Sequence, residues 1–332
     1  MTVDYHVHLE EGPYSFRWLD RTNKALEYFH PEKEYKHGLS WIQSRHQLLA
    51  DRLKNGAYST EWLDLYLMKA KEIGLSEVGI VDHLYRFFET KSYFEKHMDI
   101  SDTELGRLQH KWLKQVMTEN MGEFVQFIEG QKAKWAEQGI QLRLGIEADF
   151  FPGCESELKE LLELYQWDYV IGSVHFVDGW GFDNPETVDH FSTYDLPLLY
   201  SRFFEIVEQA VRSGLFDFVA HLDNLKVFGI RPDEDGLLPH YRKIAAALCE
   251  TDTATEVNAG LYYRYPIKEM CPSPLFLKEL VNAGVAFTTS SDSHFPDDLG
   301  KYVHQNTELL KSLGKSEIAA FNRRKRHFAP IR

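Results

Sequence analysis

The sequence has 332 residues, of which 43% are apolar and 27% are charged, so the chain can bury a sizeable core and disorder is excluded for most of it. Its 37 basic and 51 acidic residues give a net charge of −14, which disfavours diffuse attraction to nucleic acid or to an anionic membrane. We therefore predict neither nucleic acid nor membrane as a partner, and we expect any anionic substrate to be held by a local site.

The cysteines and the N-terminus bear on the cellular compartment. Cys154, Cys249 and Cys271 are odd in number and widely spaced, which argues against a disulfide framework and against a thiolate zinc site. The sequence shows neither a basic and apolar leader nor a run of 18 apolar residues. We expect a cytoplasmic protein that is neither exported nor membrane-spanning.

Strand and helix patterns alternate along the chain. Short β-branched or alternating apolar runs predict strands at about 2–8, 77–82, 141–149, 168–174, 216–220, 254–258 and 285–291. Amphipathic patterns predict helices at about 59–73, 122–138, 155–165, 195–213, 239–250 and 274–283. This alternation favours a parallel α/β architecture with helices outside the sheet. Since no repeat or linker divides the chain, we predict one domain over residues 1–332.

Two crossovers and the C-terminus depart from this alternation. Residues 14–70 and 84–121 are predicted to be helical insertions, and the sequence leaves open whether they form a substrate lid or pack on the flank. The basic run 323–326 is expected at the solvated end of a terminal helix.

Every predicted strand ends in side chains that can bind a metal. In strand order these residues are His6 and His8, Asp82 and His83, Glu147 and Asp149, His175, His221 and Asp223, Glu256 and Asn258, and Asp292 and His294. Because the C-terminal ends of barrel strands surround one opening, we expect these side chains to meet there.

The spacing of these residues strengthens the prediction of a metal site. His6 and His8 are two apart in a strand and face the same way, as do Asp292 and His294. Imidazole and carboxylate together suit Zn²⁺, Mn²⁺ or Fe²⁺. Glu147 lies in an apolar run, where a buried carboxylate needs a partner such as a cation.

Four further acids are ambiguous. For Asp82, Asp149, Asp223 and Glu256 we favour the role of orienting a ligand histidine slightly over direct ligation.

The ordered segments DYHVH, GIVDH, GIEADF, IGSVHF, AHLD and SSDSH resemble the motifs of the polymerase and histidinol phosphatase (PHP) superfamily, and within it the histidinol-phosphate phosphatases. The resemblance runs from about residue 3 to residue 300. It implies a distorted seven-stranded (β/α)7 barrel with helical insertions and a cluster of two or three divalent ions, Zn, Mn or Fe.

The resemblance also implies a ligand set. The first ion would be bound by His6, His8, Glu147 and Asp292, the second by the bridging Glu147 with His175 and His221, and a third by His83 and His294.

The third site departs from the family pattern. The family often has a ligand six residues after the second histidine of H-x-H, and this sequence has Tyr14 there. Glu11 is our tentative replacement and Glu10 the alternative, because a neutral phenol is a poor ligand beside an ionised carboxylate. A site with only two ions is an equal alternative.

Two-metal chemistry implies an activated water attacking in line, with Glu147 bridging the ions. Asp292 would accept the proton and donate it to the leaving alkoxide. Arg264 and Lys226 are the expected phosphate-binding cations, while Arg86 and Arg231 are weaker candidates.

These features predict a metal-dependent phosphomonoesterase that converts L-histidinol phosphate to L-histidinol and phosphate in histidine synthesis. The alternatives within the superfamily are a phosphodiesterase or nuclease and a nucleotide phosphatase. An amidohydrolase-type deaminase and a non-catalytic metal-binding protein are alternatives from other classes. The expected partner is a small phosphorylated substrate, and the sequence leaves the oligomeric state open.

Overall fold

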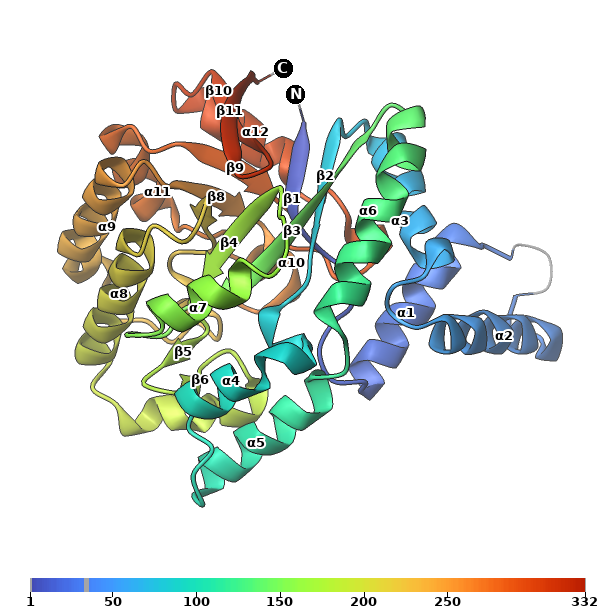
Figure 1. Cartoon of the computed structure of the whole chain (residues 1–332), viewed down its shortest axis with the longest axis horizontal. Coiled ribbons are helices and arrows are strands. Elements are labelled where there is room, and N and C mark those ends of the chain that lie inside the picture. Colours follow the sequence, from blue (N-terminus) through green and yellow to red (C-terminus); the bar gives the residue numbers. More distant parts are fainter. Residues whose placement is uncertain (1, 33–35, 332) are drawn as a thin grey trace.

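The computed structural model describes residues 2–32 and 36–331. A seven-stranded parallel sheet forms its centre, in the order β1-β2-β3-β4-β7-β8-β9 (Figure 1). These strands are β1 (Val3–His8), β2 (Glu77–Val81), β3 (Gln141–Asp149), β4 (Tyr169–Ser173), β7 (Phe218–Val219), β8 (Ala254–Asn258) and β9 (Phe287–Ser290). All seven predicted strands are confirmed, although β7 is shorter than its apolar run.

The first and last strands close the sheet nearly into a barrel. Val7 pairs with Ser293 in a parallel bridge, and the backbone N–H of His8 donates to the Ser293 carbonyl at 2.7 Å. At the N-terminal end of β1, the Thr289 hydroxyl of β9 donates to the Val3 carbonyl at 2.8 Å. The expected distorted seven-stranded (β/α)7 barrel is therefore confirmed.

Helices surround the barrel (Figure 1). The six predicted ones are α3 (Thr60–Ile73), α6 (Met121–Glu137), α7 (Glu155–Leu162), α8 (Leu196–Arg212), α9 (Leu238–Glu250) and α11 (Pro274–Ala283). Two more follow late strands: α10 (Gly260–Arg264) and α12 (Val303–Ser312). Within the described ranges, none of the helices is long and apolar enough to cross a membrane.

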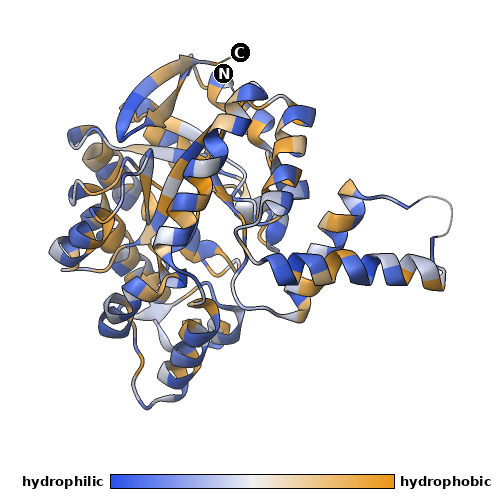
Figure 2. Cartoon of the chain, turned by 45° about the vertical axis from the view of Figure 1, so that its right-hand side comes forward, coloured by the Kyte–Doolittle hydropathy of each residue, from blue (hydrophilic) through white to orange (hydrophobic). Residues whose placement is uncertain are grey.

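The first insertion forms α1 (Phe16–Phe29) and α2 (Leu39–Asn55), which project from the barrel as an arm with apolar positions along it (Figure 2). Arg52 on α2 anchors the arm, because its buried guanidinium pairs with Glu10 at 2.7 Å and lies over the Trp62 ring. Arg21 on α1 pairs with Asp297 and Asp298 after β9, at 3.1 and 3.0 Å. The arm therefore flanks the barrel beside the β1 and β9 ends.

The second insertion contains α4 (Lys91–His97) and α5 (Glu104–Val116). It supports a hairpin that the sequence patterns did not predict, β5 (Phe176–Val177) with β6 (Trp180–Gly181). The Gln109 amide donates to the Gly179 carbonyl at 2.9 Å and accepts from the Gly181 N–H at 2.6 Å. Short 3₁₀ helices complete the loops: Leu84–Arg86, Phe88–Thr90, Pro185–Thr193, Asn224–Lys226, Glu234–Leu237 and Pro296–Asp298.

The C-terminus is a β-hairpin, β10 (Glu317–Asn322) with β11 (Lys325–Pro330), so the expected terminal helix is wrong. The basic run forms its turn, where Arg323 and Arg324 adopt left-handed φ values of 50° and 60°. The Arg324 N–H donates to the Asp168 carbonyl at 2.8 Å, and its guanidinium pairs with Asp217. These tertiary contacts hold a turn conformation that the local sequence does not favour.

Candidate metal centre

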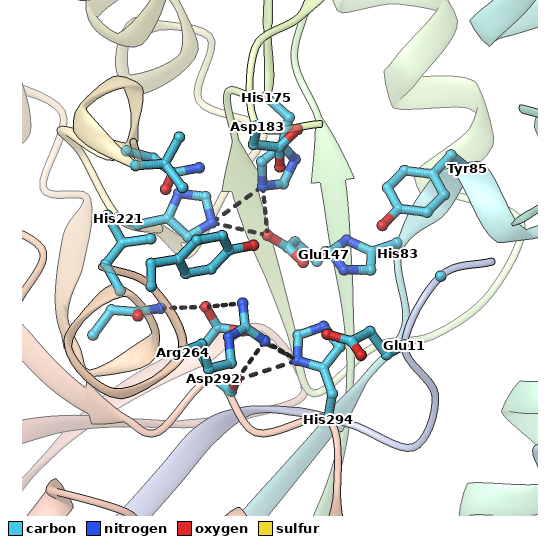
Figure 3. Close-up of a pocket in the computed structure, with 16 residues that line it drawn as sticks. Glu11, His83, Tyr85, Glu147, His175, Asp183, His221, Arg264, Asp292 and His294 are labelled. Carbon is cyan, nitrogen blue, oxygen red and sulfur yellow. Dashed lines mark hydrogen bonds and ion pairs between the residues drawn. The ribbon is translucent and has the colours of Figure 1, made fainter. Parts of the chain in front are cut away.

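Eight predicted ligands converge at the C-terminal ends of the strands, and all are buried: His6, His8, His83, Glu147, His175, His221, Asp292 and His294. In the described part of the chain they form four groups of three whose potential ligand atoms lie within 4.8 Å of one another. Several of them line a pocket of about 120 Å³ at the barrel mouth (Figure 3). The parallel strands thus bring together residues that are nearly 290 positions apart in the chain.

Glu147 lies at the centre of this cluster. Its Oε2 atom is 3.2 Å from His6 Nε2, 3.3 Å from His8 Nε2 and 2.8 Å from His83 Nδ1. Burial opposes ionisation, but the charges of His83 and His6, together with hydrogen bonds, hold the pKa of Glu147 well below its usual range. The carboxylate is therefore available as an anion.

The other oxygen of Glu147 faces a second set of histidines. Oε1 lies 3.2 Å from His221 Nε2 and 3.6 Å from His175 Nε2, and it accepts a hydrogen bond from the Ser173 hydroxyl at 2.6 Å. One carboxylate thus reaches both sets of imidazoles, which is the placement required of a bridging ligand.

Buried polar atoms without hydrogen-bond partners test whether this cluster fits metal ions. Within residues 2–32 and 36–331, both ring nitrogens of His8, His83 Nδ1 and Glu147 Oε2 lack a hydrogen bond with acceptable geometry. Burial together with the charge of His83 lowers the pKa of His8 well below its usual value, which favours the neutral form that binds metals. Buried polar atoms without a hydrogen bond destabilise the fold unless a ligand contacts them. Imidazole nitrogens together with a carboxylate suit Zn²⁺, Mn²⁺ or Fe²⁺ as that ligand.

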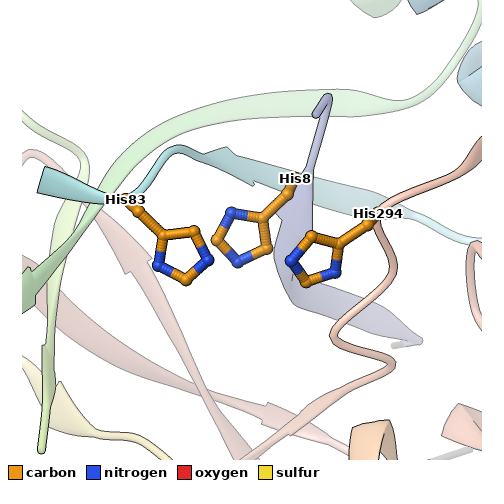
Figure 4. A group of neighbouring side chains, drawn as sticks. All are labelled: His8, His83 and His294. Atoms are coloured by element: carbon orange, nitrogen blue, oxygen red, sulfur yellow. The ribbon is translucent and has the colours of Figure 1, made fainter. Parts of the chain in front are cut away.

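The rings of His8, His83 and His294 lie side by side (Figure 4). His8 stacks on His83 at 4.2 Å and on His294 at 4.3 Å between ring centroids. His8 therefore belongs to the group with the two predicted third-site residues, as well as to the group with His6 and Asp292.

Two ambiguous acids contact ligand histidines. Both Glu256 oxygens lie 3.2 Å from His6 Nδ1, and Asp149 Oδ1 lies 2.7 Å from His175 Nδ1. Burial lowers the pKa of His175, but the charge of Asp149 and the hydrogen bond to it outweigh burial and raise the value to about 10. Both acids have the geometry of residues that orient a metal-binding imidazole.

Asp292 is held in a left-handed conformation with φ 53° at the end of β9. Asn258 Nδ2 donates to Asp292 Oδ2 at 3.3 Å. A Cβ at Gly260 would lie 2.4 Å from Asp292 Oδ2, so the glycine permits this carboxylate to approach. The approach and the φ value are of the kind found at functional sites.

Arg264 lies in the pocket beside the cluster, as expected. Nη1 donates to the Asp292 carbonyl at 3.1 Å and contacts His294 Nδ1, while Nη2 lies 3.6 Å from Asp292 Oδ2. Its buried Nε has no hydrogen-bond partner among the described residues. The guanidinium therefore retains an unpaired donor beside the cluster.

Lys226 does not line the pocket, contrary to expectation. The side chain is wholly buried, and Nζ lies 2.8 Å from Asp223 Oδ2, 2.7 Å from Glu269 Oε1 and 2.6 Å from the Met270 carbonyl. These three partners use the donors of the ammonium, so we do not retain Lys226 as a phosphate-binding residue.

The two weaker cations also lie outside the pocket. Arg86 is buried against Asp82 at 3.0 Å and Glu119 at 3.3 Å, and Arg231 pairs with Glu269 at 2.8 Å. Asp82 and Asp223 thus pair with cations, and within the described ranges neither contacts a histidine ring.

The loop after β1 distinguishes the two glutamates considered for a third ion. Glu10 is buried and occupied by Arg52 and the Trp18 indole N–H. Glu11 lines the pocket, with Oε1 3.1 Å from Arg17 Nη2. Tyr14 is 51% exposed and packs edge-on against Trp18. Of the two carboxylates, Glu11 is the one at the pocket.

Asp183, Tyr85 and Tyr265 are among the pocket residues that were not predicted from the sequence. Asp183 follows the β5–β6 hairpin, whose two-residue strands are too short to produce a periodic signal. Tyr85 lies in the second insertion and stacks on His83 with ring centroids 4.5 Å apart.

Comparisons with known proteins agree with this geometry. Residues 57–260 match the family described as PHP domain. A "Probable histidinol-phosphatase" of Deinococcus radiodurans is 36% identical over 208 residues, covering 62% of this chain and 77% of the relative. A "Histidinol-phosphatase" of Lactococcus lactis is 24% identical over 219 residues, covering 61% and 76%.

A solved structure has a similar fold over nearly the whole chain. It is the histidinol phosphate phosphatase of Lactococcus lactis complexed with zinc, L-histidinol and phosphate. The TM-score is 0.65 and the identity 18%, and the match covers 98% of each chain.

Proposed function

This chain belongs to the PHP domain family, and on that premise we propose that it is a metal-dependent phosphomonoesterase that hydrolyses L-histidinol phosphate to L-histidinol and phosphate. The observation that carries the proposal is the barrel mouth, where histidines surround Glu147 beside Arg264. Several buried polar atoms of these histidines and of Glu147 have no hydrogen-bond partner among the described residues. The relative named as a histidinol-phosphatase supports the choice of substrate.

We propose that the cluster binds two or three divalent ions, with zinc, manganese and iron as candidates. His6, His8, Glu147 and Asp292 would bind the first ion, Glu147, His175 and His221 the second, and His83, His294 and Glu11 a third. When bound, such ions activate a water and offset phosphoryl charge.

Side chains of the protein would bind the phosphate, hold the proton and orient the metal-binding histidines. Arg264 would bind phosphoryl oxygen through charge-assisted hydrogen bonds. Asp292, which Asn258 and Arg264 orient, would hold the proton that passes to the leaving alkoxide. Glu256 and Asp149 would keep His6 and His175 in their binding orientations.

We also propose that residues 1–332 act as one domain and that the protein is cytoplasmic. The C-terminal hairpin packs under the barrel, where Phe321 contacts Tyr5 on β1 with ring centroids 5.9 Å apart. The three cysteines are free thiols, which is compatible with a reducing compartment.

A substrate panel tests the activity. Protein loaded separately with Zn²⁺, Mn²⁺ or Fe²⁺ is assayed on histidinol phosphate, nucleotide monophosphates and bis(p-nitrophenyl) phosphate. We expect the highest kcat/KM for histidinol phosphate. A comparable value for a nucleotide would favour a nucleotide phosphatase, and a preference for the diester would favour a phosphodiesterase or nuclease.

A further inference from the structure

Asp183 differs from the other acids that line the pocket because, among the described residues, its carboxylate has no hydrogen-bond or ion-pair partner. Glu147 contacts histidines, Glu11 pairs with Arg17, and Asp292 lies beside Arg264. Across the described residues, no hydrogen bond or ion pair involves the Asp183 side chain, and Asp183 is in none of the metal-competent groups. A carboxylate that faces a cavity in this state is free to bind a cationic ligand.

The backbone holds Asp183 in place at the pocket. The preceding residue, Phe182, is fully buried and donates its N–H to the His175 carbonyl at 3.2 Å. Gly181 donates its N–H to the Gln109 amide oxygen at 2.6 Å, which ties the loop to the second insertion. Because the two residues before Asp183 are held by these hydrogen bonds, the backbone places Asp183 at the pocket.

Asp183 and Arg264 lie on opposite sides of the pocket. Figure 3 shows Asp183 on the side of His175, across the pocket from Arg264 and Asp292. Burial raises the pKa of Tyr265; the charge of Arg264 lowers this pKa and that of Asp183 raises it, so both charges act on this phenol. A ligand whose anionic end reaches Arg264 and whose cationic end reaches Asp183 would satisfy both groups.

From this arrangement we infer that Asp183 forms a subsite for the protonated amine of the substrate, an inference that rests on the proposed function. Histidinol phosphate has its amine on the carbon next to the phosphorylated CH₂, so an ammonium must lie close to the reacting phosphate. A carboxylate near the cluster would form a charge-assisted hydrogen bond with it. Tyr85 and Tyr265 also line the pocket, and aromatic rings attract cations.

The subsite also disfavours competing substrates. A nucleotide monophosphate lacks this ammonium and would leave the Asp183 carboxylate desolvated without a partner. Asp183 would therefore favour binding of histidinol phosphate and disfavour binding of a nucleotide monophosphate.

The test compares Asp183→Asn with wild type on three phosphate esters. Histidinol phosphate carries amine and imidazole, L-alaninol phosphate keeps only the amine, and the des-amino analogue of histidinol phosphate keeps only the imidazole. We expect the variant to raise KM about 10- to 100-fold for the two amine-bearing esters and to leave KM for the des-amino ester nearly unchanged. The kcat values and the metal content should remain close to those of wild type.

Asp178→Asn is the matched control, because this carboxylate lies in the same hairpin but pairs with Arg202 on the outside, at 2.8 Å. It should leave the kinetics on all three esters unchanged. Isothermal titration of L-histidinol into the Asp183→Asn protein gives a second measure and should show an affinity loss of similar size.

Three outcomes would overturn the inference. Equal increases of KM for all three esters would assign Asp183 to the metal centre or to the stability of the fold. Increases confined to the imidazole-bearing esters would assign Asp183 to binding of the substrate imidazole. Unchanged KM values would show that Asp183 does not contact the substrate. The proposed function is tested by a different measurement, the substrate preference of the wild-type protein. If wild type shows no preference for histidinol phosphate, the proposed function is wrong and the amine subsite is wrong as well.

Discussion

The two ends of the barrel are built from the same seven strands but treat their buried polar atoms differently. At the floor, the Tyr5 hydroxyl donates to Glu77 at 2.6 Å and the Tyr169 hydroxyl donates to the Tyr5 carbonyl at 2.7 Å. Arg143 also pairs with Glu77, at 2.8 Å. At the mouth, by contrast, His8, His83 and Glu147 keep buried atoms without hydrogen bonds.

The packing of the ends differs in the same way. Phe321 of the C-terminal hairpin contacts Tyr5, Tyr169 and Phe218, with ring centroids 5.9, 6.1 and 5.5 Å away, so aromatic rings fill the floor. The mouth instead keeps a cavity of about 120 Å³. Paired polar groups and dense packing therefore stabilise the floor. At the mouth, polar groups without hydrogen bonds surround a cavity and are available to bind ligands.

Changing one buried glutamate at each end of the barrel should produce the largest difference between the two ends. Glu147→Gln removes the charge that faces five histidines, so we expect loss of bound metal and a fall in kcat/KM of more than about 100-fold. Elemental analysis and kinetics measure both effects.

Glu77→Gln at the floor is the control. It should lower stability while metal content and kcat remain unchanged, because Glu77 contacts Tyr5 and Arg143 and no member of the cluster among the described residues. Full metal retention in Glu147→Gln would contradict the bridging role.

Arg264→Ala tests whether the mouth binds phosphate through this cation. We expect kcat/KM to fall by about 100-fold, the cost of losing one donor to charge that grows in the transition state. Metal content should be retained.

Arg231→Ala removes an arginine of the same charge that pairs with Glu269 outside the pocket, and it should leave the kinetics unchanged. Wild-type kinetics in Arg264→Ala would assign phosphate binding to another group.

Phe321→Ala tests the floor. Deleting a buried ring that contacts three aromatic residues should lower the free energy of unfolding by about 3–5 kcal/mol. Chemical denaturation measures the loss, and kcat per folded molecule should not change. A selective loss of metal in the folded variant would show that the two ends are coupled.

Glu11→Gln has the smallest expected effect, because Glu11 lies at the rim with Arg17 as a partner. If Glu11 completes a third site, metal-loaded wild-type crystals should show three anomalous peaks, one with a Glu11 oxygen at about 2.0–2.2 Å, and the variant should show two. Two peaks in wild type, with Glu11 still on Arg17, would limit the cluster to two ions.

Most of the fold and the metal-competent cluster could be predicted from the sequence because both follow from local pattern. The period of apolar residues identified the seven strands and six outer helices. Parallel strands direct their C-terminal ends to one opening, so the residues ending each strand were expected to meet there, and eight of them do.

Other features depended on contacts between distant residues. Lys226 and Arg264 both follow strands, yet Asp223 and Glu269 draw the lysine into the core while the arginine remains at the pocket. Glu10 and Glu11 are adjacent, and Arg52, 42 positions away from Glu10, determines which of them is occupied.

The strand ends, and with them the ligand types of the mouth, were determined by the sequence alone, because periodicity and strand direction are properties of a short stretch of chain. Only the tertiary structure decided the basic turn of the C-terminal hairpin and the place of Asp183. The turn depends on Asp168 and Asp217, and Asp183 depends on a hairpin held by Gln109, 72 positions from Gly181. Which charges are paired and which remain free is set by partners that only folding brings together.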